Sequence, residues 1–138
     1  MTKDKILLLI SICIILFACA QSNLEECDCQ KMTVWSIDCG ILFPTNITKE
    51  NIKTNPKTEI TDKTLQDSFI TAILKLTPTV HSDGIDNRFL IQIDCKNSRT
   101  IEIESNCSLT MYDHNYYTTS EDLVKLIKQN TKNTDLNK

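Results

Sequence analysis

Residues 88–107, RFLIQIDCKNSRTIEIESNC, carry the clearest structural pattern of the chain, in which two alternating runs flank a short polar segment. Residues 88–95 and 100–107 place apolar side chains at every second position, which is the period that gives a β-strand one buried face. Residues 96–99 (KNSR) are polar turn formers. The pattern therefore predicts an antiparallel β-hairpin.

The register of this hairpin follows from matching apolar residues across the two strands. Pairing Cys95 with Ile101 and Ile93 with Ile103 buries like with like and requires a turn of odd length. In that register Cys95 and Cys107 are separated by about six positions, roughly 20 Å at about 3.3 Å per residue. Because a disulfide needs Cα atoms within about 7 Å, we predict that these two cysteines are not bonded to each other.

The segments before the hairpin carry two further signals. Residues 32–43 (MTVWSIDCGILF) are rich in β-forming side chains and predict a first strand, which Pro44 ends. Residues 63–76 predict a helix, because Thr61 or Asp62 can cap its N-terminus. Its apolar residues recur at helical spacing and form one stripe: Leu65, Phe69, Ala72, Ile73 and Leu76.

The segments after the hairpin predict one more hairpin and a closing helix. Residues 108–112 and 116–118 suggest two short strands around a polar turn. Thr119 or Ser120 can cap the helix that follows, and two acidic residues in its first turn suit the helix dipole.

The predicted order is β-α-β-β-β-α, with residues 45–60 and 77–87 as loops. Antiparallel strands covered on one face by helices form a two-layer α+β domain. We therefore expect a single α+β domain over residues 32–129, with an antiparallel sheet of about four strands and two helices on one face. Residues 19–31 are expected to be a polar tether before the domain, and residues 130–138 a disordered tail.

The N-terminus is typical of an export signal. Lys3 and Lys5 precede an almost unbroken apolar run at residues 6–17 (ILLLISICIILF). Such a run has the length of a signal-peptide core and is too short to span a bilayer comfortably. We therefore expect residues 1–18 to be a signal peptide.

The end of this signal resembles the lipobox of bacterial lipoproteins. In Leu16-Phe17-Ala18-Cys19 a leucine lies three residues before the cysteine and a small residue lies directly before it. The resemblance implies cleavage before Cys19 and attachment of a diacylglyceryl group to its thiol, so that lipid anchors the chain to a membrane. Ordinary signal cleavage before Gln21 is the alternative.

Seven cysteines are present, of which Cys13 would leave with the signal and Cys19 would carry lipid. The others could form two disulfides and leave one thiol unpaired in an oxidising compartment; they are Cys27, Cys29, Cys39, Cys95 and Cys107. A metal site built from the first three is the alternative. Their spacing matches no zinc-binding pattern, and we expect no metal and no cofactor.

Few residues suggest chemistry. His81 and His114 are the only histidines, and neither belongs to a recognisable nucleophile, phosphate-binding or metalloprotease motif. We therefore expect no catalytic residues. Tyr112, Tyr116 and Tyr117 surround a predicted hairpin tip and could form an interaction surface, because tyrosine is favoured at interfaces. Cross-strand pairing that stabilises the turn is the interpretation we favour.

The formal net charge of −3 argues against a nucleic-acid binder and against electrostatic docking to an anionic membrane. We expect a membrane-anchored, non-catalytic binding module that faces the periplasm or the cell surface and has a protein partner; an inhibitor or an immunity protein is a module of this type. One alternative is a small secreted enzyme with an unrecognised site. The other is a secreted eukaryotic glycoprotein stabilised by disulfides, in which Asn46 or Asn106 would carry glycan at a matching sequon.

Overall fold

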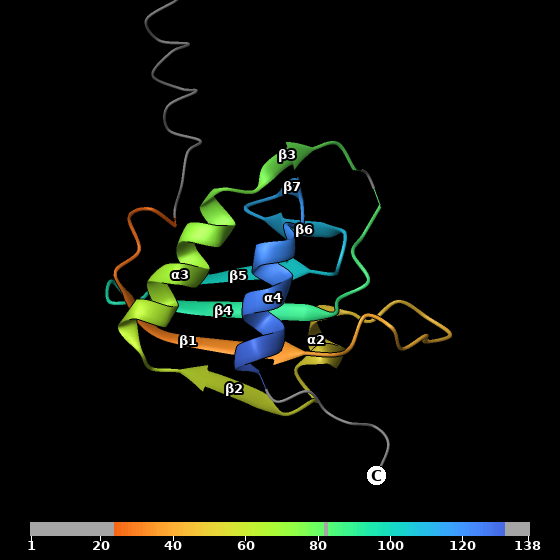
Figure 1. The fold of residues 1–138 in the computed structure, drawn as a ribbon, viewed down its shortest axis with the longest axis horizontal. Coiled ribbons are helices and arrows are strands. Elements are labelled where there is room, and N and C mark those ends of the chain that lie inside the picture. Colours follow the sequence, from red (N-terminus) through yellow and green to blue (C-terminus); the bar gives the residue numbers. More distant parts are fainter. Residues whose placement is uncertain (1–23, 82, 132–138) are drawn as a thin grey trace, which may run out of the picture.

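The computed structural model describes residues 24–81 and 83–131. Within these residues the chain forms a seven-stranded antiparallel sheet in the order β2-β1-β4-β5-β6-β7-β3 (Figure 1). The strands are β1 (Cys29–Ser36), β2 (Lys57–Ile60), β3 (Thr77–Thr79), β4 (Phe89–Cys95), β5 (Thr100–Ser105), β6 (Leu109–Tyr112) and β7 (Asn115–Thr118). The helices are α2 (Lys49–Ile52), α3 (Lys63–Leu74) and α4 (Glu121–Asn130).

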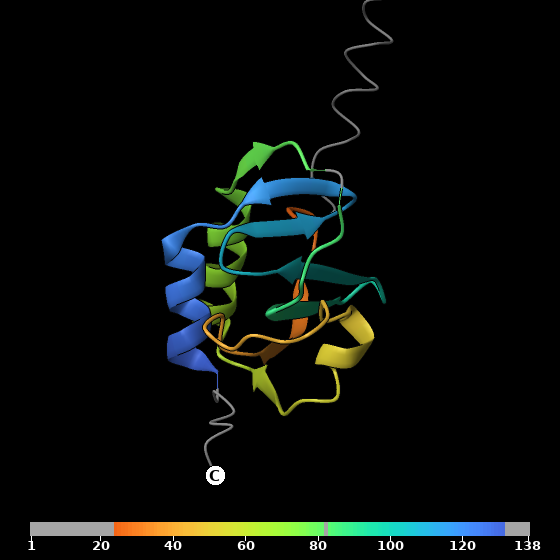
Figure 2. The ribbon, with the colours of Figure 1, turned by 90° about the vertical axis from the view of Figure 1, so that its right-hand side faces the viewer.

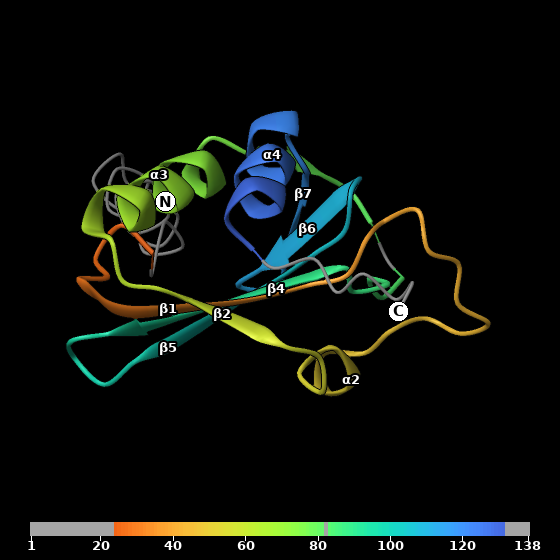
Figure 3. The same ribbon diagram turned by 60° about the horizontal axis from the view of Figure 1, so that its bottom comes forward.

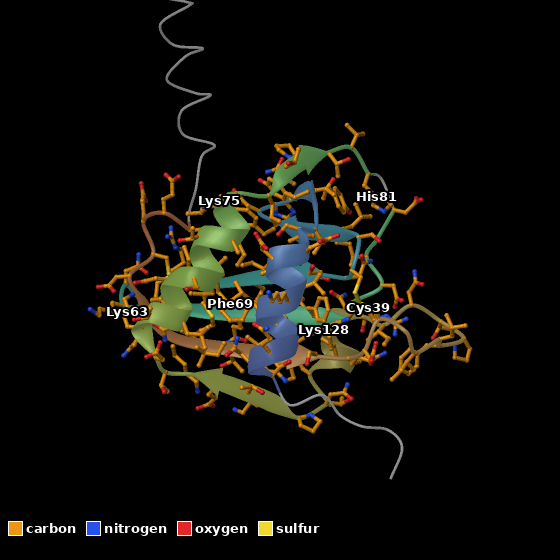
Figure 4. The ribbon with its side chains drawn as sticks, in the orientation of Figure 1. Cys39, Lys63, Phe69, Lys75, His81 and Lys128 are labelled. Atoms are coloured by element: carbon orange, nitrogen blue, oxygen red, sulfur yellow. A yellow bond between two sulfur atoms is a disulfide. The ribbon has the colours of Figure 1, made fainter. Side chains whose placement is uncertain are left out.

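The helices cover both faces of the sheet. Helices α3 and α4 lie side by side over one face, whereas the short helix α2 lies on the other (Figures 2 and 3). The main core fills the space under α3 and α4, where Phe69 is fully buried (Figure 4). A smaller core under α2 is made of Trp35, Ile37, Ile47, Ile52 and Leu90.

The predicted fold class is wrong, because the sheet has seven strands rather than about four and is the dominant element. Segments that we predicted as loops contain β2 and β3, which are the two edges of the sheet, and also α2. In β2 only Ile60 is buried, and β3 contains Pro78, which lacks a backbone donor and is tolerated on edge strands. Edge strands of this kind show no apolar alternation, so the pattern does not reveal them.

The domain begins earlier than we predicted. Leu24 is buried, and β1 starts at Cys29 rather than at residue 32. Residues 24–31, which we assigned to the tether, therefore belong to the folded domain. At its other end β1 stops at Ser36, and the predicted continuation to residue 43 is an irregular segment.

The hairpin of β4 and β5 forms where it was predicted, but its register differs by two residues. Ile93 lies opposite Ile101 instead of Ile103. Because the shift is an even number, the same side chains still point into the core. The reason lies in the turn, where Ser98 adopts a left-handed conformation (φ 64°) and its N–H donates to the Cys95 carbonyl at 3.0 Å. This turn is shorter than the one that we predicted, so the pairing of β4 with β5 begins after fewer turn residues.

Both predicted helix caps are confirmed. The Asp62 carboxylate accepts a hydrogen bond from the Leu65 N–H at 2.7 Å, at the start of α3. The Ser120 hydroxyl accepts from the Leu123 N–H at 3.2 Å, at the start of α4. Thr119, the other candidate for the second cap, is buried instead, and its hydroxyl bonds to that of Thr110.

Candidate functional site

Two disulfides hold the described domain together. One joins Cys27 to Cys95 and the other joins Cys39 to Cys107. Cys95 and Cys107 are therefore not bonded to each other, as predicted. Cys29 is a free, buried thiol whose pKa is raised by burial. Because Cys27 and Cys39 are both oxidised, the alternative metal site is contradicted.

The second disulfide lies at the base of an exposed loop. This loop, residues 38–46, connects β1 to the segment before α2 and projects from the end of the sheet (Figure 3). We call it the projecting loop. Cys39 sits near its start, at the edge of the domain (Figure 4). The loop therefore leaves the sheet from a covalently fixed point.

The tip of the projecting loop exposes apolar side chains. Leu42 is 92% exposed and Phe43 is 39% exposed, whereas Ile41 packs partly against the smaller core. Large apolar side chains that lie together and remain exposed to solvent are unfavourable in a free protein. Such groups often mark interaction sites. The tip is therefore the candidate functional site.

A buried arginine supports the tip from below. Arg88 is only 7% exposed, and its Nη1 donates to the Ile41 carbonyl oxygen at 2.7 Å. Its Nε and Nη2 both donate to Oδ2 of Asp86, at 3.1 and 2.7 Å. The guanidinium carbon lies 4.9 Å from the centre of the Phe43 ring, a cation–π contact. A charge-assisted pair of this geometry fixes the arginine, which in turn fixes the loop backbone.

The far side of the projecting loop is fixed by the same polar cluster. The Ile47 N–H donates to Oδ1 of Asp86 at 2.7 Å. The Ile47 carbonyl accepts from the Asn87 backbone N–H at 2.9 Å and from its side-chain amide at 3.2 Å. That amide also donates to the Glu104 carboxylate at 2.9 Å. The loop is thus held at its start, beneath its tip and at its end.

This cluster was missed in the sequence. The sequence analysis assigned Asp86 and Asn87 to the loop of residues 77–87, and Arg88 to the start of a strand. The available signal was the run of three polar residues directly before the apolar strand, which the structure explains by burial of Asn87 and Arg88. Which loop they would support depends on the pairing of β1 with β4, and no local pattern shows it.

The three tyrosines do not form one surface. The rings of Tyr112 and Tyr117 stack on each other, with centroids 5.4 Å apart. Tyr116 instead contacts His81 edge-on at 5.1 Å, and its hydroxyl donates to the Asp83 carbonyl at 3.1 Å. The Tyr112–Tyr117 stack joins the neighbouring strands β6 and β7, whereas the contacts of Tyr116 join β7 to the segment after β3. Burial raises the pKa of Tyr112.

The histidines and cavities show no convergent chemistry. His81 packs on a tyrosine, and His114 occupies the β6–β7 turn with a left-handed backbone (φ 60°). A groove of about 790 Å³ between α3 and α4 is lined by mixed charges, including Asp67, Lys75 and Lys125. Within residues 24–81 and 83–131, no three His, Cys, Asp or Glu side chains gather as metal ligands would.

The two glycosylation sequons differ in their environment. Asn46 is exposed, near the end of the projecting loop. The side chain of Asn106 is already used, because its oxygen accepts from the backbone N–H groups of Ser108 and Leu109 at 2.8 Å each. Only Asn46 therefore presents a free side chain to solvent.

A charge cluster on the α2 face stabilises the fold rather than the tip. Glu102 of β5 forms ion pairs with Lys49 at 2.8 Å and Lys53 at 2.5 Å, and Lys53 also lies over the Trp35 ring. Burial raises the pKa of Glu102, but hydrogen bonds from the two lysines outweigh it and lower the pKa. The same contact raises the pKa of Lys49.

We expect the substitution Glu102→Gln to reduce the pH dependence of stability in acid. Because the folded pKa of Glu102 is lowered, its stabilisation is present above the ordinary glutamate pKa and is lost as the pH falls through the folded value. The loss at pH 7 should be below about 1 kcal/mol, since the pairs are partly solvated. Urea unfolding at pH 7 and pH 3 measures it, with Glu26→Gln as an exposed control. Equal losses at both pH values would contradict the expectation.

The signal segment 1–18 and Cys19 lie outside the described residues, as do residues 132–138 of the predicted tail. In the part of the chain that is described, no helix is long and apolar enough to cross a membrane. No protein-family model, curated protein or solved structure matches the chain.

Proposed function

We propose that this chain is a lipid-anchored, non-catalytic interaction module of the bacterial cell envelope, which binds a partner protein through the tip of the projecting loop. The observation that carries this proposal is the combination of an exposed Leu42 with the buried Arg88 that fixes the backbone beneath it. A loop held in one conformation loses little entropy on binding, so more of its contact energy appears as affinity.

Two further observations support the location. The two disulfides fit an exported protein, because such bonds persist in oxidising compartments. The lipobox-like residues 16–19 supply the anchor. Lipid attachment would leave the domain free to use its whole surface for the partner, since each buried methylene contributes about 0.8 kcal/mol to membrane affinity.

The anchor is tested by substitution of Cys19. The full chain and its Cys19→Ala variant are expressed in a bacterial host with lipoprotein-processing enzymes, and membrane fractions and intact masses are compared. We expect the unchanged chain in the membrane fraction, starting at Cys19 with the added mass of its acyl chains, and the variant without lipid.

Three results would overturn the anchor. They are a chain that starts at Gln21, a chain whose Cys19 carries no lipid, and a variant that stays in the membrane fraction to the same extent. A glycan on Asn46 in the native host would instead support the eukaryotic glycoprotein.

A further inference from the structure

The shape of the projecting loop indicates the form of its partner. Leu42 stands almost free at the tip, and its two neighbours Ile41 and Phe43 turn partly back to the domain. A single apolar side chain on a narrow projection fits a concave apolar pocket better than a flat surface. Val80 is equally exposed (99%), but its side chain is smaller, and the segment around it is held by contacts with Tyr116 rather than by a buried ion pair.

The backbone at the tip is also available for binding. Residues 41–43 belong to no helix, strand or turn. Within residues 24–81 and 83–131, the N–H and C=O groups of Leu42 form no hydrogen bond. An irregular segment with free backbone groups can pair with a strand edge in a partner, while alternate side chains enter its pockets. Backbone pairing beside a pocket for one side chain is how an endopeptidase holds its substrate.

The disulfide and the hydrogen bonds that hold the two sides of the tip distinguish an inhibitor from a substrate. If the Leu42–Phe43 peptide bond were hydrolysed, the disulfide at Cys39 would retain the N-terminal side. The contacts of Ile47 with Asp86 would retain the C-terminal side. Arg88 would hold both new ends, through the Ile41 carbonyl and the Phe43 ring. Ends that stay together occupy the cleft instead of leaving it.

The loop is poorly suited to a lipid surface. Residues 38–46 contain one acidic residue and no Lys or Arg, so anionic headgroups do not attract them. The loop follows the end of β1, whereas the described chain begins before the start of β1, at the opposite end of that strand (Figures 1 and 3). From Cys19 to Leu24 the chain spans at most about 18 Å when fully extended. A lipid on Cys19 therefore favours an orientation in which the loop points away from the membrane.

From these observations we infer that the partner is an endopeptidase with an apolar primary specificity pocket, and that the projecting loop inhibits it by placing Leu42 in that pocket. The inference rests on the proposed function and names its partner class. No covalent bond between the two proteins is required. Specificity comes from the Leu42 side chain, and resistance to turnover comes from the fixed ends of the loop.

The test uses the full mature chain with chymotrypsin and subtilisin as probes that accept large apolar side chains, and trypsin as a probe that requires a basic one. We expect inhibition of at least one of the first two and none of trypsin. Leu42→Lys should weaken that inhibition by about 100-fold, as expected for a central interface residue, and should create inhibition of trypsin. Val80→Lys introduces the same side chain at an equally exposed position and should change neither.

A second variant tests the role of the disulfide at the base of the loop. Cys39→Ser/Cys107→Ser removes the bond at the base of the loop, and circular dichroism verifies that the domain still folds. We expect this variant to be hydrolysed after Leu42 at least about 10-fold faster than the unchanged chain, because a loop that is free at one end no longer keeps its ends together.

Three outcomes would overturn the inference. The first is no inhibition of either apolar-specific probe, the second is equal behaviour of the Leu42 and Val80 variants, and the third is rapid hydrolysis of the unchanged loop. In each case the lipid on Cys19 and the membrane association are measured separately. Failure of the inhibitor test with the anchor intact would therefore reject the partner class and leave the anchored module standing.

Discussion

The double substitution Cys27→Ala/Cys95→Ala is expected to lower the free energy of unfolding by about 4 kcal/mol. The bond closes a separation of 68 residues, so its removal greatly enlarges the conformational freedom of the unfolded chain. It also ties the segment before β1, which contains the buried Leu24, to the end of β4. Urea unfolding followed by circular dichroism gives the change, under identical conditions for both proteins.

The double variant is needed because of the free thiol nearby. Cys29 lies directly opposite Cys95 in the pairing of β1 with β4. If Cys27 alone were replaced, Cys29 could take its place as the partner of Cys95 and mask the loss. In the intact protein, burial raises the pKa of Cys29 and so suppresses the thiolate that would attack the native disulfide.

The control for this prediction is Cys29→Ala, which removes one buried sulfur and no bond. We expect a loss of about 1 kcal/mol from the smaller side chain. A disulfide variant that is no less stable than this control would show that the bond contributes nothing to folding.

The substitution Phe69→Ala is expected to cost 3–5 kcal/mol, roughly the range for removing a fully buried aromatic ring. Phe69 of α3 has no exposed surface and lies in the main core, so its loss leaves a cavity between the helices and the sheet. For a domain of this size the melting temperature should fall by about 15–30 °C. Differential scanning calorimetry measures the shift.

Phe43→Ala is the matched control, since it removes the same ring from an exposed site on the projecting loop. Its cost should be below about 1 kcal/mol, which is the value of an exposed cation–π contact with Arg88. Similar losses for the two variants would show that the main core is not where the structure places it.

The candidate site shows what a sequence pattern can predict and what it cannot. The apolar residues 41–43 are visible in the sequence, but we assigned them to a first strand because they follow β-forming residues. The structure ends β1 at Ser36 and turns the chain outward. An apolar run does not show which of its residues are covered, because coverage depends on elements from elsewhere in the chain.

The disulfides show the same limit. The spacing within one hairpin was enough to exclude a bond between Cys95 and Cys107, even though the predicted register was wrong by two residues. It did not choose their partners, because Cys27 and Cys39 reach them only through the pairing of β1 with β4. A strained backbone at Ser98 changed the register through a turn that the residue types alone did not specify.

The features that depend on neighbouring residues could be predicted from the sequence. These are the alternating faces of β4 and β5, the helices α3 and α4 and their caps at Asp62 and Ser120. Such features follow from backbone geometry and side-chain period within a few residues. The seven-stranded order, the disulfide partners and the burial of Arg88 beneath the loop follow only from the three-dimensional packing. Each of these joins segments that are far apart in the chain, so only the packing of the whole domain selects them.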